Sequence, residues 1–356
     1  MTKKKIALIG GDGIGTEVVR EAKLFLEWCR ERHGVPLELW ELDLGADRYL
    51  RDKTTFPTEI KQEIAASCSA VLLGALGDPR VPGLEHARDI LFGMRFGFDL
   101  YANVRPVKCL SDRLVPLKGR KASDVDFTVF RENTEGVYVG FGGQFKRGTP
   151  DEIGINEDVN TRKGVERIIR AAFEFARANK KTKVCMADKS NAMRFAHELW
   201  LRCFQEVAAE YPSIEARHVY VDALCLYVVQ DPSQFEVVVT NNLFGDIVTD
   251  LGAALQGGLG MAPSANVHAA EPDRVALFEP VHGSAPPLAG KDVANPFAAL
   301  LTAGMMLDHI GFTGWEAKVE AAVTAAIDAG KCTKDVGGEL GTRAAGAWVR
   351  ERLAAG

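Results

Sequence analysis

The sequence predicts an α/β protein in which helices cover both faces of a parallel or mixed sheet. Short apolar runs, such as AVLLG at 70–74 and FEVVVT at 235–240, are typical of strands buried on both faces. Between such runs lie segments with helical spacing, of which 162–178 is the clearest because its apolar residues recur every three or four positions. Strands and helices that alternate in this way usually form one sheet between two helical layers.

Further elements follow the same pattern along the chain. The other expected strands are 4–9, 37–43, 127–130, 183–187 and 215–221, with an extended segment at 99–107. The other expected helices are 16–32, 58–66, 85–94, 194–210, 223–229, 241–252, 294–311, 315–329 and 343–354. Residues 257–284 read as loops and short strands. Residues 141–160 are rich in Gly, Asn and acidic residues without a helical period, which indicates an arm or hairpin.

Length and composition limit the kind of protein. The 356 residues exceed the size at which single cores usually stop growing, so we expect two domains or one interrupted domain. The net charge is −5 and no basic block is present, which argues against nucleic acid or an anionic membrane as a partner. No apolar stretch is long enough to span a bilayer, and the N-terminal apolar run of four residues is too short for a secretory signal. Scattered cysteines without a CxxC pair are typical of a reducing compartment, so we expect a cytoplasmic protein.

The stretch NNLFGDIVTDLG at 241–252 carries the strongest chemical signal. Asp246 and Asp250 are four residues apart in a helical pattern, so both carboxylates would lie on one helix face. Two such anions repel each other unless a cation lies between them, and Mg²⁺ and Mn²⁺ prefer oxygen ligands. A solvated acidic face is the alternative. The preceding apolar strand favours the metal site, because α/β enzymes bind ligands at the ends of buried strands.

The N-terminal motif GGDGIG at 10–15 lies between an expected strand and an expected helix. A helix N-terminus attracts anions, which would suit a nucleotide phosphate. However, the spacing matches neither GxGxxG nor the phosphate-loop pattern. A tight turn whose glycines adopt positive φ angles is the simpler interpretation.

Several other polar residues stand at the ends of expected strands or in apolar segments. Arg95, Arg105 and Arg131 have the guanidinium forks that bind carboxylates, although each alone could be an ordinary ion-pair arginine. Tyr138 and Lys189 follow strands and could transfer protons. Asp222, which closes the strand expected at 215–221, could supply a third metal carboxylate. Such a set suits a hydroxy acid whose oxygens a metal ion polarises.

Together these motifs make the chain resemble the metal-dependent β-decarboxylating dehydrogenases. This family includes isopropylmalate, isocitrate, homoisocitrate and malate/tartrate dehydrogenases. The matching segments run in order along nearly the whole chain: GGDGIG at 10–15, LYANVRPVK at 100–108, RENTEGVYVG at 131–140, DKSNAM at 188–193, VDAL at 221–224, NNLFGDIVTDLGA at 241–253, FEPVHGSAP at 278–286 and AGKDVANP at 289–296.

The resemblance implies two interleaved α/β domains with mixed parallel and antiparallel sheets, unlike a Rossmann fold. Residues 1–101 and 253–356 would form the cofactor-side domain. Residues 102–252 would form the substrate, metal and dimerisation domain, and an arm near 141–160 would clasp a second subunit. The active sites of the implied homodimer would be shared between its subunits.

The resemblance also implies roles for particular residues. Asp246 and Asp250 would bind Mg²⁺ or Mn²⁺ together with Asp222 of a second subunit. Lys189, also lent across the dimer, would help to deprotonate the C2 hydroxyl of a 2-hydroxy acid. Tyr138 would protonate the enolate left by the loss of CO₂. The substrate's carboxylates would be held by Arg95, Arg105 and Arg131.

The implied redox cofactor is a nicotinamide dinucleotide. Asn191 would lie near the nicotinamide, and the adenosine segment would consist of His282, Gly283, Ser284, Ala285 and Pro286, with Asn295 further on. After GSAP, members that use NAD usually carry Asp and members that use NADP usually carry Lys, whereas this chain has Pro287. No basic residue lies within HGSAPPLAG to pair with a 2′-phosphate, so we expect NAD. Arg343 is the nearby residue that could favour NADP.

The segment before Arg95 would face the variable end of the substrate. Leu91 and Phe92 would bury an aliphatic group, which stabilises binding by about 0.8 kcal/mol per CH₂. Asp89 would repel a third carboxylate, whereas Arg88 could reach one. This end therefore favours 3-isopropylmalate, an intermediate of leucine biosynthesis. D-malate or tartrate, isocitrate and homoisocitrate remain alternatives.

Two other classes of function compete with an active enzyme. A silent regulatory subunit would have lost catalytic groups, yet all the acids, the arginines, Lys189 and Tyr138 are present. A phosphate-transferring protein built on GGDGIG would need the phosphate-loop lysine, which this motif lacks.

Overall fold

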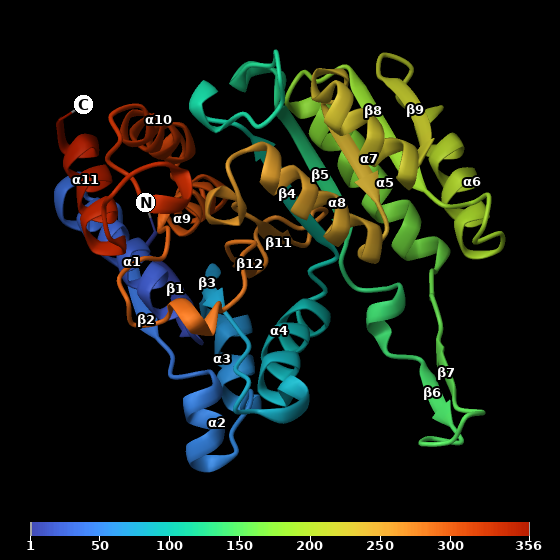
Figure 1. Ribbon diagram of the computed structural model, residues 1–356, viewed down its shortest axis with the longest axis horizontal. Coiled ribbons are helices and arrows are strands. Elements are labelled where there is room, and N and C mark those ends of the chain that lie inside the picture. The colour runs from blue at the N-terminus through green and yellow to red at the C-terminus, as the bar shows by residue number, and fades with distance from the viewer. Residues whose placement is uncertain (1, 356) are drawn as a thin grey trace.

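The computed structural model describes residues 2–355 and has one large mixed sheet between two layers of helices (Figure 1). The strands are β1 Lys4–Gly11, β2 Leu37–Glu41, β3 Ala70–Ala75, β4 Ala102–Lys108, β5 Asp126–Glu132, β6 Gly142–Phe145, β7 Ile153–Asn156, β8 Lys183–Asp188, β9 Glu215–Tyr220, β10 Val237–Thr240, β11 Ala265–Val267 and β12 Ala276–Phe278. The helices are α1 Gly15–His33, α2 Ala46–Asp52, α3 Thr58–Ser67, α4 Glu85–Gly97, α5 Arg162–Ala178, α6 Ala196–Ala208, α7 Val221–Gln230, α8 Asn242–Leu255, α9 Phe297–His309, α10 Trp315–Asp328 and α11 Thr342–Ala355. The expected α/β class with a mixed sheet is confirmed.

The large sheet has the order β2-β1-β3-β12-β11-β4-β5-β10-β8-β9. Its two wings are parallel, and the strands β12, β11, β4 and β5 at its centre pair antiparallel with one another. Strands from both ends of the sequence form one wing, whereas strands from the middle form the other. The division into domains 1–101 plus 253–356 and 102–252 stays a prediction, and the sheet is continuous across that boundary.

Alternation along the central strands assigns their side chains to two faces. Val104 and Phe130 pack into the core beneath α5 and α9, whereas Val107 and Val129 pack beneath α7 and α8. The wing formed by β1 and β3 is covered on this second face by α3 and α4. The second face is thus covered by two separate helix pairs, and the central strands between α4 and α8 carry the polar residues of the site.

Most expected elements are present within a few residues of their expected bounds, and two expectations were incomplete or wrong. The helix α2 was not expected, because only Ala46 of its seven residues is buried and it therefore has no apolar period. Asp222 does not close a strand: β9 ends at Tyr220, and Asp222 lies in the first turn of α7. Residues 141–160 form the antiparallel hairpin β6–β7, which extends away from the body of the molecule (Figure 1). Within residues 2–355, no helix has the length and apolar character that a membrane span requires.

Candidate active site

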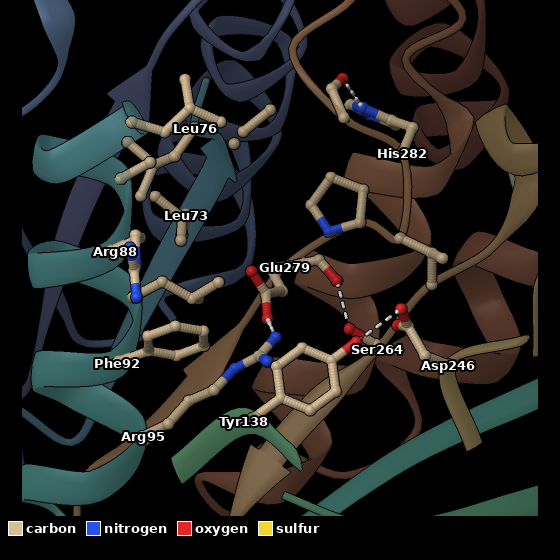
Figure 2. A pocket seen from close by; sticks show the side chains of 18 of the residues that line it. Leu73, Leu76, Arg88, Phe92, Arg95, Tyr138, Asp246, Ser264, Glu279 and His282 are labelled. Carbon is tan, nitrogen blue, oxygen red and sulfur yellow. Dashed lines mark hydrogen bonds and ion pairs between the residues drawn. The ribbon is translucent and has the colours of Figure 1, made fainter. Parts of the chain in front are cut away.

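A cavity of about 290 Å³ lies between α4, α8 and the central strands (Figure 2). Its walls include residues that the family resemblance assigned to one site: Leu91, Phe92, Arg95, Arg105, Arg131, Tyr138, Asp246, His282 and Gly283. These residues come from six segments of the chain. Ser264 and Glu279 also line the cavity, although no role was expected for them.

Arg95 lies in the last turn of α4 and is paired with a carboxylate. Its Nη2 donates a hydrogen bond of 2.7 Å to Glu279, which follows β12 directly. The Arg95 Nε is buried, and no residue among 2–355 accepts a hydrogen bond from it. An unpartnered buried donor is costly unless a ligand accepts from it, so this atom marks where an anion would fit.

Arg105 is held by three neighbours on the same face of the sheet. Its Nε donates to Asn103 at 2.6 Å, its Nη1 donates to Thr249, and its Nη2 lies 3.5 Å from Asp246. Asn103 is two residues earlier on β4, so strand alternation directs both side chains to one face. Burial lowers the pKa of the Arg105 guanidinium, but an arginine keeps its charge in a protein.

Arg131, on the neighbouring strand β5, lies beneath α8. Its Nε and Nη2 donate to Asn242 at 3.1 and 2.7 Å, and its Nη1 donates to Asp246. The close approach of the helix depends on Gly245, because a Cβ there would meet the Arg131 side chain at 2.4 Å. Asn241 caps the helix by accepting from the Phe244 N–H, which fixes where α8 begins.

Asp246 joins these arginines to the phenol of Tyr138. The Tyr138 hydroxyl donates to Asp246 at 3.1 Å, and the Arg131 guanidinium carbon lies 5.3 Å from the Tyr138 ring centre. Burial alone would raise the pKa of the Asp246 carboxyl, but Arg131 and Arg105 lower it below its ordinary value. Burial and Asp246 raise the pKa of Tyr138, so its phenol stays protonated and can donate a proton at neutral pH.

Asp250 lies one turn beyond Asp246 on α8, as its spacing predicts. Burial, followed by repulsion from Asp246, raises the pKa of the Asp250 carboxyl. A divalent cation would relieve that repulsion, so the two carboxylates fit part of a Mg²⁺ or Mn²⁺ site. Within residues 2–355 of one chain, no three His, Cys, Asp or Glu side chains are grouped to hold a metal.

Lys189 and Asp222, both assigned to this site by the resemblance, form a separate pair. The Lys189 Nζ donates to Asp222 at 2.7 Å, and neither residue is among those that line the cavity. This hydrogen bond lowers the pKa of the Asp222 carboxyl. The Asp222 side chain is 68% exposed, and Asn191, two residues after Lys189, is also exposed. The chain therefore presents these three residues at its surface.

The expected adenosine segment packs against the GGDGIG turn. The Ile14 N–H donates to the Ser284 carbonyl at 2.8 Å, and the Ser284 hydroxyl donates to the Gly77 carbonyl. Gly13 has φ +55°, and a Cβ there would meet the Ser284 carbonyl oxygen at 2.0 Å. The tight-turn interpretation of this motif therefore describes its backbone.

The remaining expected cofactor residues lie on either side of this contact. His282 faces the arginine cavity, and its Nε2 is buried without a hydrogen-bond partner among residues 2–355. A Cβ at Gly283 would meet nothing within 4 Å, so the space beside this residue is open. Ala285 and Pro286 lead into the short 3₁₀ turn Pro286–Leu288. Asn295 is buried, and its amide donates to Asp335 at 2.9 Å.

The apolar end of the cavity is formed by α4. Leu91 and Phe92 face the cavity, and the Phe92 ring meets the Tyr138 ring edge to face at 6.2 Å. Arg88, one turn before Phe92, lines the same end (Figure 2). The expected combination of aliphatic, aromatic and cationic groups is therefore assembled at one place.

Sequence reasoning missed the polar residues that hold the arginines in place. Glu279 and Asn103 lie inside quoted motifs, and Asn103 could have been found by its two-residue spacing from Arg105. Asn242 and Thr249 are neighbours of the acidic pair on α8. Asn266 gave no signal, because its strand has only three residues.

Comparisons with known proteins find relatives of this chain. The profile of the family described as isocitrate/isopropylmalate dehydrogenase matches residues 5–349. A 3-isopropylmalate dehydrogenase of Thermobifida fusca is 45% identical over 319 residues, which cover 90% of each chain. One of Streptomyces griseus is 42% identical over 96% of this chain and 98% of its own. A solved isocitrate dehydrogenase from Methylococcus capsulatus is 36% identical, with a TM-score of 0.88 over 98% of this chain and 99% of that one.

Proposed function

Because this chain is a member of the isocitrate/isopropylmalate dehydrogenase family, and thus a decarboxylating dehydrogenase, we propose that it converts 3-isopropylmalate into 4-methyl-2-oxopentanoate and reduces NAD. The observation that carries the proposal is the cluster of Arg95, Arg105 and Arg131 beside the apolar wall of Leu91 and Phe92. The substrate has two carboxylates and one branched aliphatic group, which matches this division of the cavity.

The arginines would bind the carboxylates of the substrate. Three guanidinium groups form ion pairs with only two carboxylates, those of Asp246 and Glu279. Buried charge of one sign is costly and favours an anionic ligand. The unpartnered Nε of Arg95 is one donor that such a ligand would satisfy.

Asp246 and Asp250, with Asp222 of the partner subunit, would hold Mg²⁺ or Mn²⁺. When bound, the metal would polarise the substrate's hydroxyl and carbonyl oxygens, and NAD would accept the hydride from C2. Lys189 of the partner subunit would take up the proton of the C2 hydroxyl. The protonated Tyr138 phenol would return a proton to C3 after CO₂ has left.

A homodimer with shared sites is part of this proposal. Asp222 is exposed and Lys189 partly exposed, and the two are paired with each other, away from the arginine cavity of their own chain. Exposed apolar side chains lie on α7, on α8 and on the arm, including Leu226, Val229, Ile247, Phe141 and Phe145. A second copy that covered these side chains would bring its own lysine and aspartate to the cavity.

NAD is the proposed cofactor and the cytoplasm the proposed location. The His282 Nε2, which lacks a hydrogen-bond partner among residues 2–355, and the open space beside Gly283 fit a bound nucleotide. Pro287 offers no side-chain charge for a 2′-phosphate, and Arg343 is 3.8 Å from Asp292, which would compete for it. The cysteines are unpaired, as expected in a reducing compartment.

A family alternative, isocitrate or homoisocitrate oxidation, is favoured by one observation. Arg88 lines the apolar end of the cavity and could bind a third carboxylate. D-malate and tartrate, which lack the aliphatic group, would leave the Leu91 and Phe92 wall unfilled.

A steady-state panel tests the proposal. Turnover of 3-isopropylmalate, isocitrate, homoisocitrate, D-malate and tartrate is measured with NAD and with NADP, in the presence of Mg²⁺ or Mn²⁺. We expect the highest kcat/KM for 3-isopropylmalate with NAD. A higher kcat/KM for another acid would overturn the substrate assignment, and a preference for NADP would overturn the cofactor assignment.

A further inference from the structure

We propose that Asn266 is a positioning residue that sets the spacing of the three cavity arginines. This proposal rests on the proposed function, because it assumes that these arginines bind the carboxylates of one substrate. Asn266 is completely buried on β11 and is not among the residues that line the cavity. It would therefore act through other side chains.

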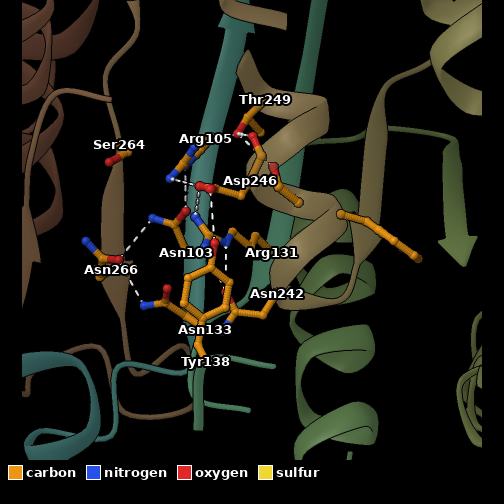
Figure 3. A network of polar contacts seen from close by, with 12 residues as sticks. Asn103, Arg105, Arg131, Asn133, Tyr138, Asn242, Asp246, Thr249, Ser264 and Asn266 are labelled. Atoms are coloured by element: carbon orange, nitrogen blue, oxygen red, sulfur yellow. Dashed lines mark hydrogen bonds and ion pairs between the residues drawn. The ribbon is translucent and has the colours of Figure 1, made fainter. Parts of the chain in front are cut away.

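All four hydrogen-bonding positions of the Asn266 amide are occupied, and Figure 3 shows the two at its oxygen. Its oxygen accepts from Asn103 at 3.0 Å and from Asn133 at 2.9 Å. Its nitrogen donates to Glu279 at 3.0 Å and to the Leu277 carbonyl at 3.2 Å. An amide has two acceptor and two donor positions, so this site uses its full capacity.

One of these bonds leads to Arg95. Asn266 donates to Glu279 Oε1, the same oxygen that accepts from the Arg95 Nη2. The carboxylate is thereby held between an amide on the sheet and a guanidinium on α4. The position of the Arg95 fork relative to β11 depends on this connection.

The two bonds to the oxygen lead toward Arg105 and Arg131. Asn103 faces Asn266 directly across the β4–β11 pair and accepts from the Arg105 Nε at 2.6 Å. Asn133 follows Arg131 by two residues, just after β5 ends, and also donates to the Leu100 carbonyl. Asn266 is thus one buried point connected to the segments that carry all three arginines.

An asparagine suits this position because acceptors and donors are required on opposite sides of one side chain. An apolar residue would leave one N–H of each of the Asn103 and Asn133 amides without its acceptor, and a carboxylate would face Glu279 without a hydrogen atom to donate. An unpaired buried polar group costs about 1–3 kcal/mol. The partners would then move to find new hydrogen bonds, and the arginines would move with them.

Loss of this spacing has a specific consequence for binding. A ligand held at two carboxylates depends on the distance between its guanidinium partners, whereas a ligand with one carboxylate does not. 3-Isopropylmalate and 2-hydroxy-4-methylpentanoate share the same skeleton, but the second compound lacks the carboxylate on C3. Their relative affinities therefore report the arrangement of the arginines separately from the general integrity of the cavity.

The test uses Asn266→Leu and the milder Asn266→Ser in the full-length protein with Mg²⁺. Serine is smaller and polar and leaves room for a water molecule, so folding is expected to persist. Calorimetry without NAD gives the Kd of each ligand. We expect the Kd of 3-isopropylmalate to rise at least about tenfold and that of 2-hydroxy-4-methylpentanoate less than about threefold. In turnover, KM should rise with kcat nearly unchanged.

Gln256→Leu is the matched control. Gln256 is also a buried amide and accepts from the Lys108 N–H at 2.9 Å, at the other end of β4, but it contacts none of the three arginines. We expect this variant to lose stability and to keep the same ratio of the two Kd values. Equal weakening of both ligands in the Asn266 variants, or no weakening of either, would overturn the positioning role.

Failure of the proposed function would look different. If the unmodified protein does not turn over 3-isopropylmalate, the substrate assignment is wrong before any variant is measured. The same comparison is then made with the hydroxy dicarboxylate that the unmodified protein turns over best, and with its analogue that lacks the carboxylate on C3. A change in the ratio of those two Kd values would still support the role of Asn266, and an unchanged ratio would overturn it.

Discussion

The arginine cavity and the Lys189–Asp222 pair are both charged, yet they are built in opposite ways. Arg105 and Arg131 are 6% and 2% exposed, and each makes several hydrogen bonds within the chain (Figure 3). By contrast, the Lys189 side chain is bonded to Asp222, whose side chain is 68% exposed. The arginine cavity is buried and held by hydrogen bonds, whereas the Lys189–Asp222 pair lies at the surface.

The difference in burial distinguishes side chains whose interactions are complete within one chain from side chains that are available to a second chain. Buried charges must be paired and hydrogen-bonded, and the arginine cavity meets this condition except for the atoms that would face a ligand. An exposed ion pair contributes little to folding. We therefore infer that Lys189 and Asp222 serve a second subunit rather than the stability of their own chain.

Asp250→Asn should have the largest effect, because it removes a carboxylate of the proposed metal site. Asp250 is on α8 beside Asp246. The helix partly desolvates its carboxylate, but the residue is exposed and its side chain forms no ion pair or hydrogen bond with residues 2–355. The substitution should therefore leave the arginines in place, weaken Mn²⁺ binding and lower kcat/KM by about 10³-fold or more. Mn²⁺ titration followed by electron paramagnetic resonance measures the first effect directly.

Asp273→Asn, a change of the same kind at an exposed position, is the control for Asp250. It should leave both metal affinity and turnover unchanged. Near-normal turnover of the Asp250 variant would remove that residue from the metal site.

Lys189→Met tests the exposed region. Loss of the proton acceptor should lower kcat by about 10²–10³-fold with little change in the melting temperature. Lys183→Met, at the other end of β8 and at an exposed position, should keep full activity. If Lys189→Met strongly destabilised the chain, the contrast between the two regions would be wrong.

A heterodimer of one Lys189→Met and one Asp250→Asn subunit tests whether the sites are shared. If each site takes its lysine from one subunit and its Asp250 from the other, one of the two sites is intact and about half the activity returns. If each subunit used its own residues, both sites would carry a lesion. The purified heterodimer would then be inactive.

The sequence predicted the hydrogen-bond network around the arginines less completely than the reacting groups themselves. Long periodic segments such as α5 were found because their burial pattern repeats locally. The helix α2 was missed because most of its surface faces solvent. The helix α7 was predicted to begin at residue 223 rather than 221, because no side chain caps its first turn. Asn266 could not be found, because its partners Asn103 and Asn133 are far away in sequence and meet it only across the sheet.

Tyr138→Phe should have a smaller effect on turnover than the loss of Lys189. The phenol donates to Asp246 and keeps its proton at neutral pH, but water could replace it as a slower acid. We expect kcat to fall by about 10–10²-fold while the Kd of the substrate changes little. Tyr101→Phe is the control, because that hydroxyl accepts from the Ala270 N–H and does not line the cavity. An unchanged kcat in Tyr138→Phe would remove this residue as the acid.

The smallest expected effect concerns a third kind of charged region, in which carboxylates face each other. Glu316 in the first turn of α10 lies near Glu320 and Asp308, and burial followed by these charges raises its pKa to about 7. Asp246 shows the reverse, because guanidinium groups lower its pKa. The folded protein therefore binds the Glu316 proton more tightly than the unfolded chain does. The resulting stability is fully present below the ordinary pKa of 4.5 and is lost as the pH rises through about 7.

Glu316→Gln removes this titration, because glutamine stays neutral. From pH 5 to pH 8 the free energy of unfolding should fall by about 1–3 kcal/mol more in the unmodified protein than in the variant. Urea unfolding at the two pH values measures this difference, and Glu351→Gln, at an exposed position on α11, should behave like the unmodified protein. Equal pH dependence in Glu316→Gln and the unmodified protein would mean that Glu316 is already charged at pH 5. In that case neighbouring Lys108, which lowers the pKa of Glu316 and bonds Glu320 at 2.6 Å, would outweigh burial, as the arginines do at Asp246.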